Sequence, residues 1–124
     1  MESELVKNLV ELLQNKKLKN VEAFDLKEKS ELVKFIILAT AQNEKVAKQT
    51  AVELEQEIAG LGKLVKKEGE FPGDWIILDL GDILIEIFTE DSRVYYNLEK
   101  LWGSSKNRVN EPLKKGRKAK KESK

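Results

Sequence analysis

The first part of the chain alternates between helix-like and strand-like patterns of apolar side chains. Apolar residues recur at near-helical spacing between Leu5 and Leu13, which predicts an amphipathic helix over about residues 3–15. A looser alternation predicts a strand over roughly Asn20–Leu26. The continuous apolar run Phe35–Thr40 is rich in β-branched residues, which favours a central strand buried on both faces.

A second helix and a short strand are predicted next. Asn43 is a suitable N-cap for a helix over about Glu44–Ala59, whose apolar residues fall on one side, and Gly60 is a suitable C-cap. Leu61–Val65 then reads as a short strand.

The stretch from Glu68 to Trp102 predicts a β-hairpin followed by a helix. Ile76–Leu80 and Ile83–Phe88 are apolar strands, and Gly81-Asp82 between them suits a tight turn. Thr89 is a predicted N-cap, and the helix after it ends in Leu101-Trp102.

These elements predict an α/β fold. Their order is helix, strand, strand, helix, strand, strand, strand, helix. The helix between the second and third strands permits a right-handed parallel crossover, and the last two strands form an antiparallel pair. We therefore expect a mixed five-stranded sheet with flanking helices.

Composition narrows the classes of function. The 124 residues suit a single domain, and they include neither Cys nor His, so thiolate chemistry and the commonest metal ligand are absent. No run approaches the length of a membrane-spanning helix, and the acidic N-terminus does not resemble a secretory signal. The expected location is cytoplasmic, with no membrane partner.

The net charge of +1 conceals an uneven distribution. Residues 106–124 carry nine basic and two acidic residues, a net charge of +7, which leaves 14 basic and 20 acidic residues, or −6, before them. Since this basic segment has few large apolar residues, we expect a domain over residues 1–105 and a disordered tail over 106–124.

Three carboxylates of the hairpin raise the question of catalysis. Asp79, Asp82 and Glu86 could hold Mg²⁺ or perform acid–base chemistry. However, no Asp-x-Asp pair places two carboxylates on one strand face, and no Gly-rich phosphate loop exists. A structural role, with Asp82 in the turn and Asp79 accepting hydrogen bonds at a strand end, is the favoured interpretation, and no cofactor is expected.

Aromatic residues around the hairpin are candidates for binding a partner. Trp75 begins a strand after a Pro-Gly-Asp turn, and it is either a core residue or a partly exposed anchor at an interface. Arg93 and Tyr96 are three residues apart and share one face of the last predicted helix. The basic tail could bind nucleic acid through phosphates, or it could be a solubilising segment.

The same region closely resembles the ribosomal silencing factor family (RsfS/Iojap). The resemblance rests on Glu68-Gly69, Asp74-Trp75-Ile76, Asp79-Leu80-Gly81-Asp82, Ser92-Arg93, Tyr96 and Leu98-Glu99-Lys100-Leu101-Trp102, and it extends back to about Asp25-Leu26.

The resemblance implies a translation repressor and not an enzyme. Such a protein binds the large ribosomal subunit through the uL14 ribosomal protein and blocks subunit joining during nutrient limitation. The implied fold is related to nucleotidyltransferases but lacks their active site. Residue by residue, the implied docking surface comprises Trp75, Asp79, Arg93, Tyr96, Leu98, Glu99 and Trp102.

The chain also departs from the family pattern. Lys34 stands where Asp is usual, Ala41 where Gly is usual and Glu86 where His is usual, and Asn43-Glu44-Lys45 replaces a Ser-Ser-Arg segment. Two alternatives stay open: a nucleotidyltransferase-like enzyme that uses the hairpin carboxylates, and a general RNA-binding module that acts through the tail, which could also contact rRNA. The hairpin edge could support a homodimer in the free protein.

Overall fold

The computed structural model describes residues 2–28, 30–69 and 72–91, and within them the predicted order of elements is confirmed. The elements are α1 (Glu2–Gln14), β1 (Leu18–Asp25), β2 (Phe35–Ala41), α2 (Glu44–Gly60), β3 (Lys66–Glu68), β4 (Trp75–Asp79) and β5 (Ile83–Thr89). Glu90 and Asp91 are helical directly after β5, in agreement with a helix start after Thr89, and the rest of that predicted helix lies outside the described residues.

The five strands form one mixed sheet in the order β1-β2-β5-β4-β3. The central pair, β2 and β5, is parallel, and the β1–β2, β5–β4 and β4–β3 pairs are antiparallel. The α/β mixed sheet predicted from the sequence is therefore confirmed. The chain leaves β2 through α2 and enters the far edge of the sheet at β3, which runs in the same direction as β2 but pairs with β4.

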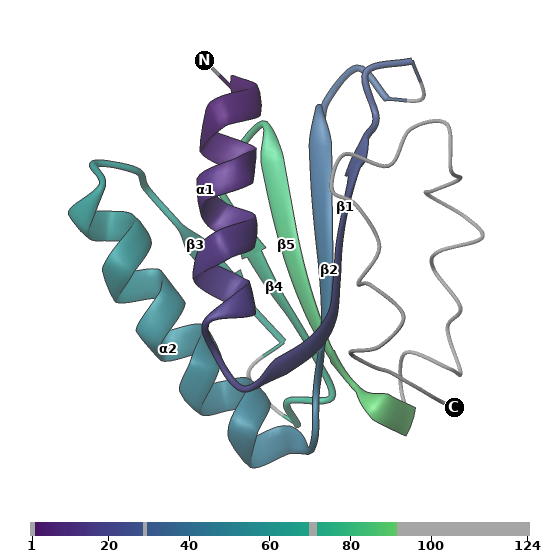
Figure 1. Cartoon of the computed structure of the whole chain (residues 1–124), viewed down its shortest axis with the longest axis vertical. Helices are drawn as coiled ribbons and strands as arrows, with labels where there is room; N and C mark the ends of the chain where they lie inside the picture. The colour runs from purple at the N-terminus through teal and green to yellow at the C-terminus, as the bar shows by residue number, and fades with distance from the viewer. Residues whose placement is uncertain (1, 29, 70–71, 92–124) are drawn as a thin grey trace.

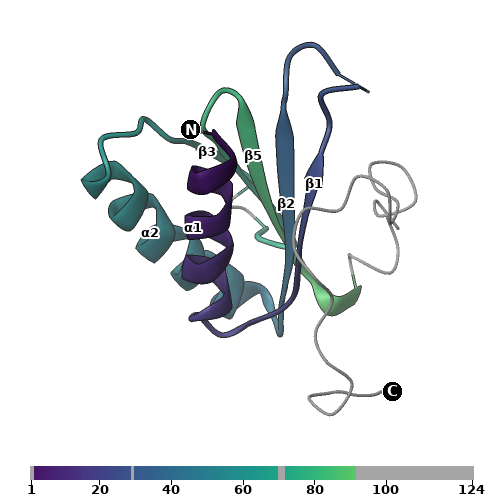
Figure 2. The same cartoon turned by 45° about the horizontal axis from the view of Figure 1, so that its top comes forward.

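Both helices lie on one face of this sheet (Figure 1). In Figure 2 they are seen together on one side of the strands. The buried residues of α1 are Val6, Leu9, Val10 and Leu13, and those of α2 repeat the same three- and four-residue spacing from Ala47 to Ile58. α1 packs on β1 and β2, whereas α2 packs on β2, β4 and β5.

Period-two alternation divides the apolar residues of the strands between two clusters. All of β2 is buried, as expected for a central strand. Phe35, Ile37 and Ala39 belong to the larger cluster beneath the helices, while Ile36 and Leu38 belong to a smaller cluster on the opposite face. The sheet thus buries apolar side chains on both sides.

The predicted C-cap of α2, Gly60, is wrong. Gly60 is the last helical residue, the C-cap is Leu61, and Gly62 takes the left-handed conformation with φ of 85°. The amides of Gly62 and Lys63 donate to the carbonyls of Ala59 and Ile58, which is the Schellman arrangement for ending a helix.

The strand predicted over Leu61–Val65 begins later, at Lys66. Leu61 and Leu64 are exposed in the connection, so their apolar character marks no buried strand. β3 instead consists of Lys66, Lys67 and Glu68, paired with β4 at the sheet edge.

Candidate functional site

The face of the sheet opposite the two helices carries an apolar cluster that contains aromatic rings and one carboxylate. We call it the aromatic face, and it comprises Phe24, Leu26, Ile36, Leu38, Trp75, Leu84, Glu86 and Phe88. No described helix packs on this face (Figures 1 and 2). Most of its members are buried, whereas Trp75 and Leu84 keep part of their surface exposed, so these two are the members that a partner could reach.

The strand register arranges these side chains in rows across the sheet, because directly paired residues share a face. One row runs Trp75, Phe88, Thr40. The next runs Ile77, Glu86, Leu38, and the third runs Asp79, Leu84, Ile36. Trp75 and Glu86 are thus diagonal neighbours on adjacent strands.

Local backbone geometry determines where β4 begins, at Trp75. Gly73, two residues earlier, has φ of 104°, and the Asp74 carbonyl accepts a hydrogen bond from the Thr89 amide at 3.1 Å. Gly69 approaches the same point from the preceding segment, so closely that a Cβ on it would lie 2.1 Å from the Trp75 carbonyl oxygen. Only glycine fits there, both for this contact and for its own φ of 84°.

The Trp75 side chain is half-buried and makes two directional contacts. Its ring lies 5.1 Å from the Phe88 ring, centroid to centroid, with the planes tilted by 30°. Its indole Nε1–H donates to Glu86 Oε1 at 3.1 Å. The Trp75 ring therefore packs against the smaller apolar cluster and keeps part of its surface exposed, which fits both interpretations offered by the sequence.

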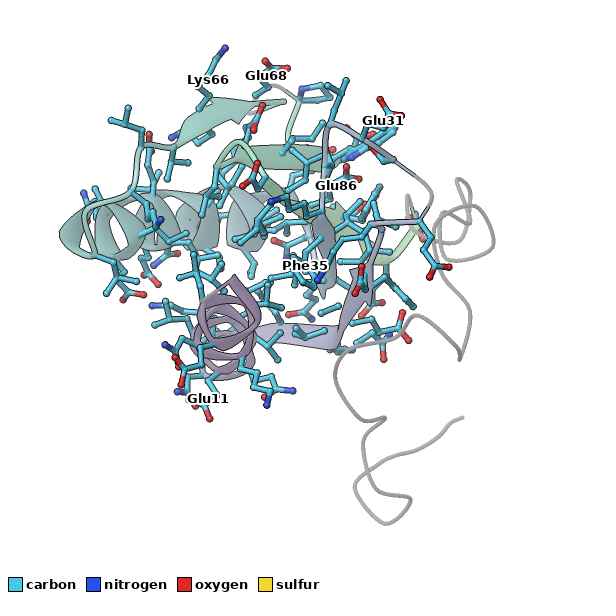
Figure 3. All side chains as sticks on the ribbon, turned by 90° about the horizontal axis from the view of Figure 1, so that it is seen from above. Glu11, Glu31, Phe35, Lys66, Glu68 and Glu86 are labelled. Carbon is cyan, nitrogen blue, oxygen red and sulfur yellow. The ribbon has the colours of Figure 1, made fainter. Side chains whose placement is uncertain are left out.

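Glu86 is a carboxylate placed among apolar residues. Only 4% of its surface is exposed, and its paired neighbours on either side are Leu38 and Ile77. Burial raises the pKa of the Glu86 carboxyl because the charged form loses its hydration, and the Trp75 hydrogen bond opposes that rise. Figure 3 shows Glu86 on the sheet away from α1, with Lys66 and Glu68 at the outer edge.

The other two acidic residues of the hairpin accept structural hydrogen bonds, Asp79 through its carboxylate and Asp82 through its backbone carbonyl. Asp79 Oδ1 accepts a hydrogen bond from the Gly81 amide at 2.8 Å, and Gly81 has φ of 98°. The Asp82 carbonyl accepts from the amides of Lys34 and Phe35. Asp79 and Asp82 therefore have the structural roles favoured by the sequence. Within residues 2–28, 30–69 and 72–91, no group of three or more acidic side chains could hold a metal ion.

Two of the seven predicted docking residues fall within the described parts of the chain. Trp75 and Asp79 lie on the same side of β4, on the aromatic face. Arg93, Tyr96, Leu98, Glu99 and Trp102 lie outside the described residues, as does the predicted tail. Sequence reasoning considered Glu86 as a catalytic candidate and as a departure from the family pattern, and it missed the contact with Trp75. A two-residue turn at Gly81-Asp82 indicates only that Trp75 and Glu86 are neighbours on adjacent strands.

The described residues form a small α/β domain. Its mixed sheet carries both described helices on one face and an aromatic cluster on the other. The chain belongs to the ribosomal silencing factor family: the model described as "Ribosomal silencing factor during starvation" matches residues 1–124. This family membership supports a role as a ribosomal silencing factor.

Individual relatives agree with this assignment. The chain is 35% identical over 103 residues to "Ribosomal silencing factor RsfS" of Halalkalibacterium halodurans, covering 82% of this chain and 88% of that protein. It is 33% identical over 92 residues to the protein of the same name from Bacillus subtilis, covering 73% and 78% of the two chains.

Solved structures share the fold. A crystal structure of a protein from Bacillus halodurans superposes with a TM-score of 0.71 at 34% identity, covering 81% of this chain and 94% of that one. A crystal structure of a protein from Chromobacterium violaceum gives a TM-score of 0.77 at 26% identity, covering 91% and 92%. Among the described helices, none is long and apolar enough to cross a membrane.

Proposed function

We propose that this protein represses translation by binding the large ribosomal subunit through the uL14 ribosomal protein and blocking subunit joining during nutrient limitation. The observation that carries the proposal is the family match over residues 1–124. The aromatic face supplies the physical means, since a half-buried Trp on a sheet face is the type of residue that dominates binding energy at protein interfaces.

We assign the docking surface to Trp75 and Asp79 on β4 together with Arg93, Tyr96, Leu98, Glu99 and Trp102. The acidic part of the chain suits a basic ribosomal protein as partner, and the basic segment 106–124 suits contact with rRNA. A division into a domain over 1–105 and a tail over 106–124, a cytoplasmic location and a dimer of the free protein belong to the same proposal.

A non-enzymatic role accords with the described hairpin. The Asp79 carboxylate is engaged by the Gly81 amide, and Glu86 is buried against the Trp75 indole. A reaction of the nucleotidyltransferase type needs carboxylates that converge on a metal. Titration with Mg-ATP should leave the amide resonances of the hairpin unmoved, and shifts there would favour the enzyme alternative.

The proposal is tested by capture of purified uL14 protein and by the rate of subunit joining, followed by light scattering. We expect wild type to bind uL14 and to slow joining, whereas Trp75→Ala binds at least about tenfold more weakly because an interface anchor is lost. Val52→Ala is the matched control, since Val52 is an exposed apolar residue of α2 on the other side of the sheet. Failure of wild-type protein to bind uL14 would overturn the proposal.

A further inference from the structure

Glu86 is placed where folding alone favours an apolar residue. Among the described residues it is the only Asp, Glu, Lys or Arg in the buried class; the other buried polar residues are threonines. Its paired neighbours, Leu38 and Ile77, are aliphatic, and a carboxylate there loses its hydration. Leu at this position would continue the apolar cluster at no such cost, so the carboxylate calls for a reason other than stability.

The hydrogen bond to Trp75 supplies that reason. A tryptophan side chain has two rotatable bonds, and two contacts of different direction restrict it here. The Phe88 ring supports one face of the indole, with centroids 5.1 Å apart. The Glu86 Oε1 holds the indole edge through Nε1–H at 3.1 Å. The stacking contact restrains the face of the ring and the hydrogen bond restrains its edge, so together they limit changes in both side-chain torsion angles.

We propose that Glu86 is a positioning residue for docking: its buried carboxylate fixes the orientation in which Trp75 meets a protein partner on the aromatic face. This inference rests on the proposed function, in which Trp75 is an anchor. An anchor that is already oriented costs less conformational entropy on binding, so the Glu86 contact raises affinity without touching the partner.

Two substitutions separate this role from a contribution to folding. Glu86→Leu removes the acceptor and fills the space with an apolar side chain, so the folded state is expected to keep or gain stability while docking weakens about tenfold. Glu86→Gln keeps an acceptor oxygen of the same shape, and it is expected to retain docking within about threefold of wild type. A merely structural residue would show docking and stability changing together.

The experiment measures binding to purified large ribosomal subunits for wild type, Glu86→Leu, Glu86→Gln, Trp75→Phe and the double variant Trp75→Phe/Glu86→Leu. Trp75→Phe keeps a ring but lacks the N–H donor, so Glu86→Leu should have no further effect in that background. In parallel, the indole ¹H–¹⁵N resonance of Trp75, identified by its loss in Trp75→Phe, should move in Glu86→Leu and stay near its wild-type position in Glu86→Gln.

The outcomes distinguish this inference from the proposed function. If wild type does not bind large subunits, the proposed function fails. If wild type binds large subunits and Glu86→Leu binds them as tightly, the proposed function stands and the positioning role is overturned. Equal effects of Glu86→Leu in the wild-type and Trp75→Phe backgrounds would also overturn it.

Discussion

At the scale of single residues, Glu86 and Trp75 form a coupled pair in which one member is costly for the fold. The carboxylate is nearly inaccessible, and its hydrogen bond from the indole offsets only part of the loss of hydration. Other charged residues on the same side of the sheet are Lys19 and Glu22 on β1, Asp79 on β4, and Lys66 and Glu68 on β3. Glu86 is the buried member of this set.

The raised pKa of Glu86 predicts how stability depends on pH. Between its ordinary value of 4.5 and the raised folded-state pKa, the folded protein binds more protons than the unfolded chain, so stability falls as pH rises through this window and is level above it. Glu86→Gln lacks this titration. Wild type should therefore lose stability relative to Glu86→Gln from about pH 4.5 upward, by about 1.4 kcal/mol for each pH unit within the window.

Urea unfolding of both proteins at a series of pH values measures this difference. Glu68→Gln is the control, because it removes a carboxylate from an exposed position on the edge strand. A difference between wild type and Glu86→Gln that is constant with pH would show that burial does not penalise the Glu86 charge.

At the scale of elements, sequence reasoning succeeds where a segment carries its own signal. The buried run of β2 and the β4–β5 hairpin are strongly patterned, and both are confirmed. β3 was misplaced because its residues, Lys66 to Glu68, are polar and take strand conformation only through pairing with β4. Leu61 and Leu64 gave a false signal, since an apolar residue can be exposed in a connection.

Prediction from the sequence has the same limit at the candidate site: it fails where a residue's environment depends on other strands. The family pattern singled out Trp75 and Asp79, and hairpin geometry predicts that both side chains of the strand share one face. The sequence does not reveal that Glu86 is buried, because burial depends on the neighbouring strands β2 and β4 and not on Glu86 itself. The hydrogen bond to Trp75 follows from that tertiary arrangement.

Gly69 directly follows the edge strand β3 and lies against the backbone of Trp75, so replacing it tests how this connection is packed. In Gly69→Ala the new Cβ would collide with the Trp75 backbone carbonyl, and the left-handed backbone would be strained as well. We expect a loss of about 2–4 kcal/mol in the free energy of unfolding and a change in Trp fluorescence.

Two glycine controls separate strain from collision. Gly81→Ala has a left-handed backbone with φ of 98° but open space around its Cβ, so it should lose only about 1–2 kcal/mol. Gly60→Ala, at the end of α2, meets neither problem and should be neutral or slightly stabilising. If Gly69→Ala were no worse than Gly81→Ala, the close approach to Trp75 would be contradicted.

At the scale of the whole molecule, two features of opposite charge serve the proposed repressor. The part before residue 106 has a net charge of −6 and the segment 106–124 has +7. The chain belongs to the ribosomal silencing factor family, and in the proposed function it acts by occupying a surface of the large ribosomal subunit. Charge then contributes to approach and orientation, while the aromatic face provides the specific contact.

Separate roles for the basic segment and the aromatic face predict the effect of removing residues 106–124. The truncated protein should bind isolated uL14 as tightly as the full chain, because the docking residues are retained. Its affinity for whole large subunits should fall at low salt, and the dependence of that affinity on salt should become weaker, because fewer phosphates are neutralised. Loss of uL14 binding on truncation would instead favour the alternative in which the tail is the binding module.

In the proposed function, Trp75 on the aromatic face docks this protein onto the large ribosomal subunit. Sucrose-gradient co-sedimentation with separated subunits tests it most directly, comparing wild type, Trp75→Ala and Val52→Ala after circular dichroism has shown that all three are folded. We expect wild type and Val52→Ala to travel with free large subunits and Trp75→Ala to remain at the top of the gradient. Co-sedimentation of Trp75→Ala at the wild-type level would contradict it.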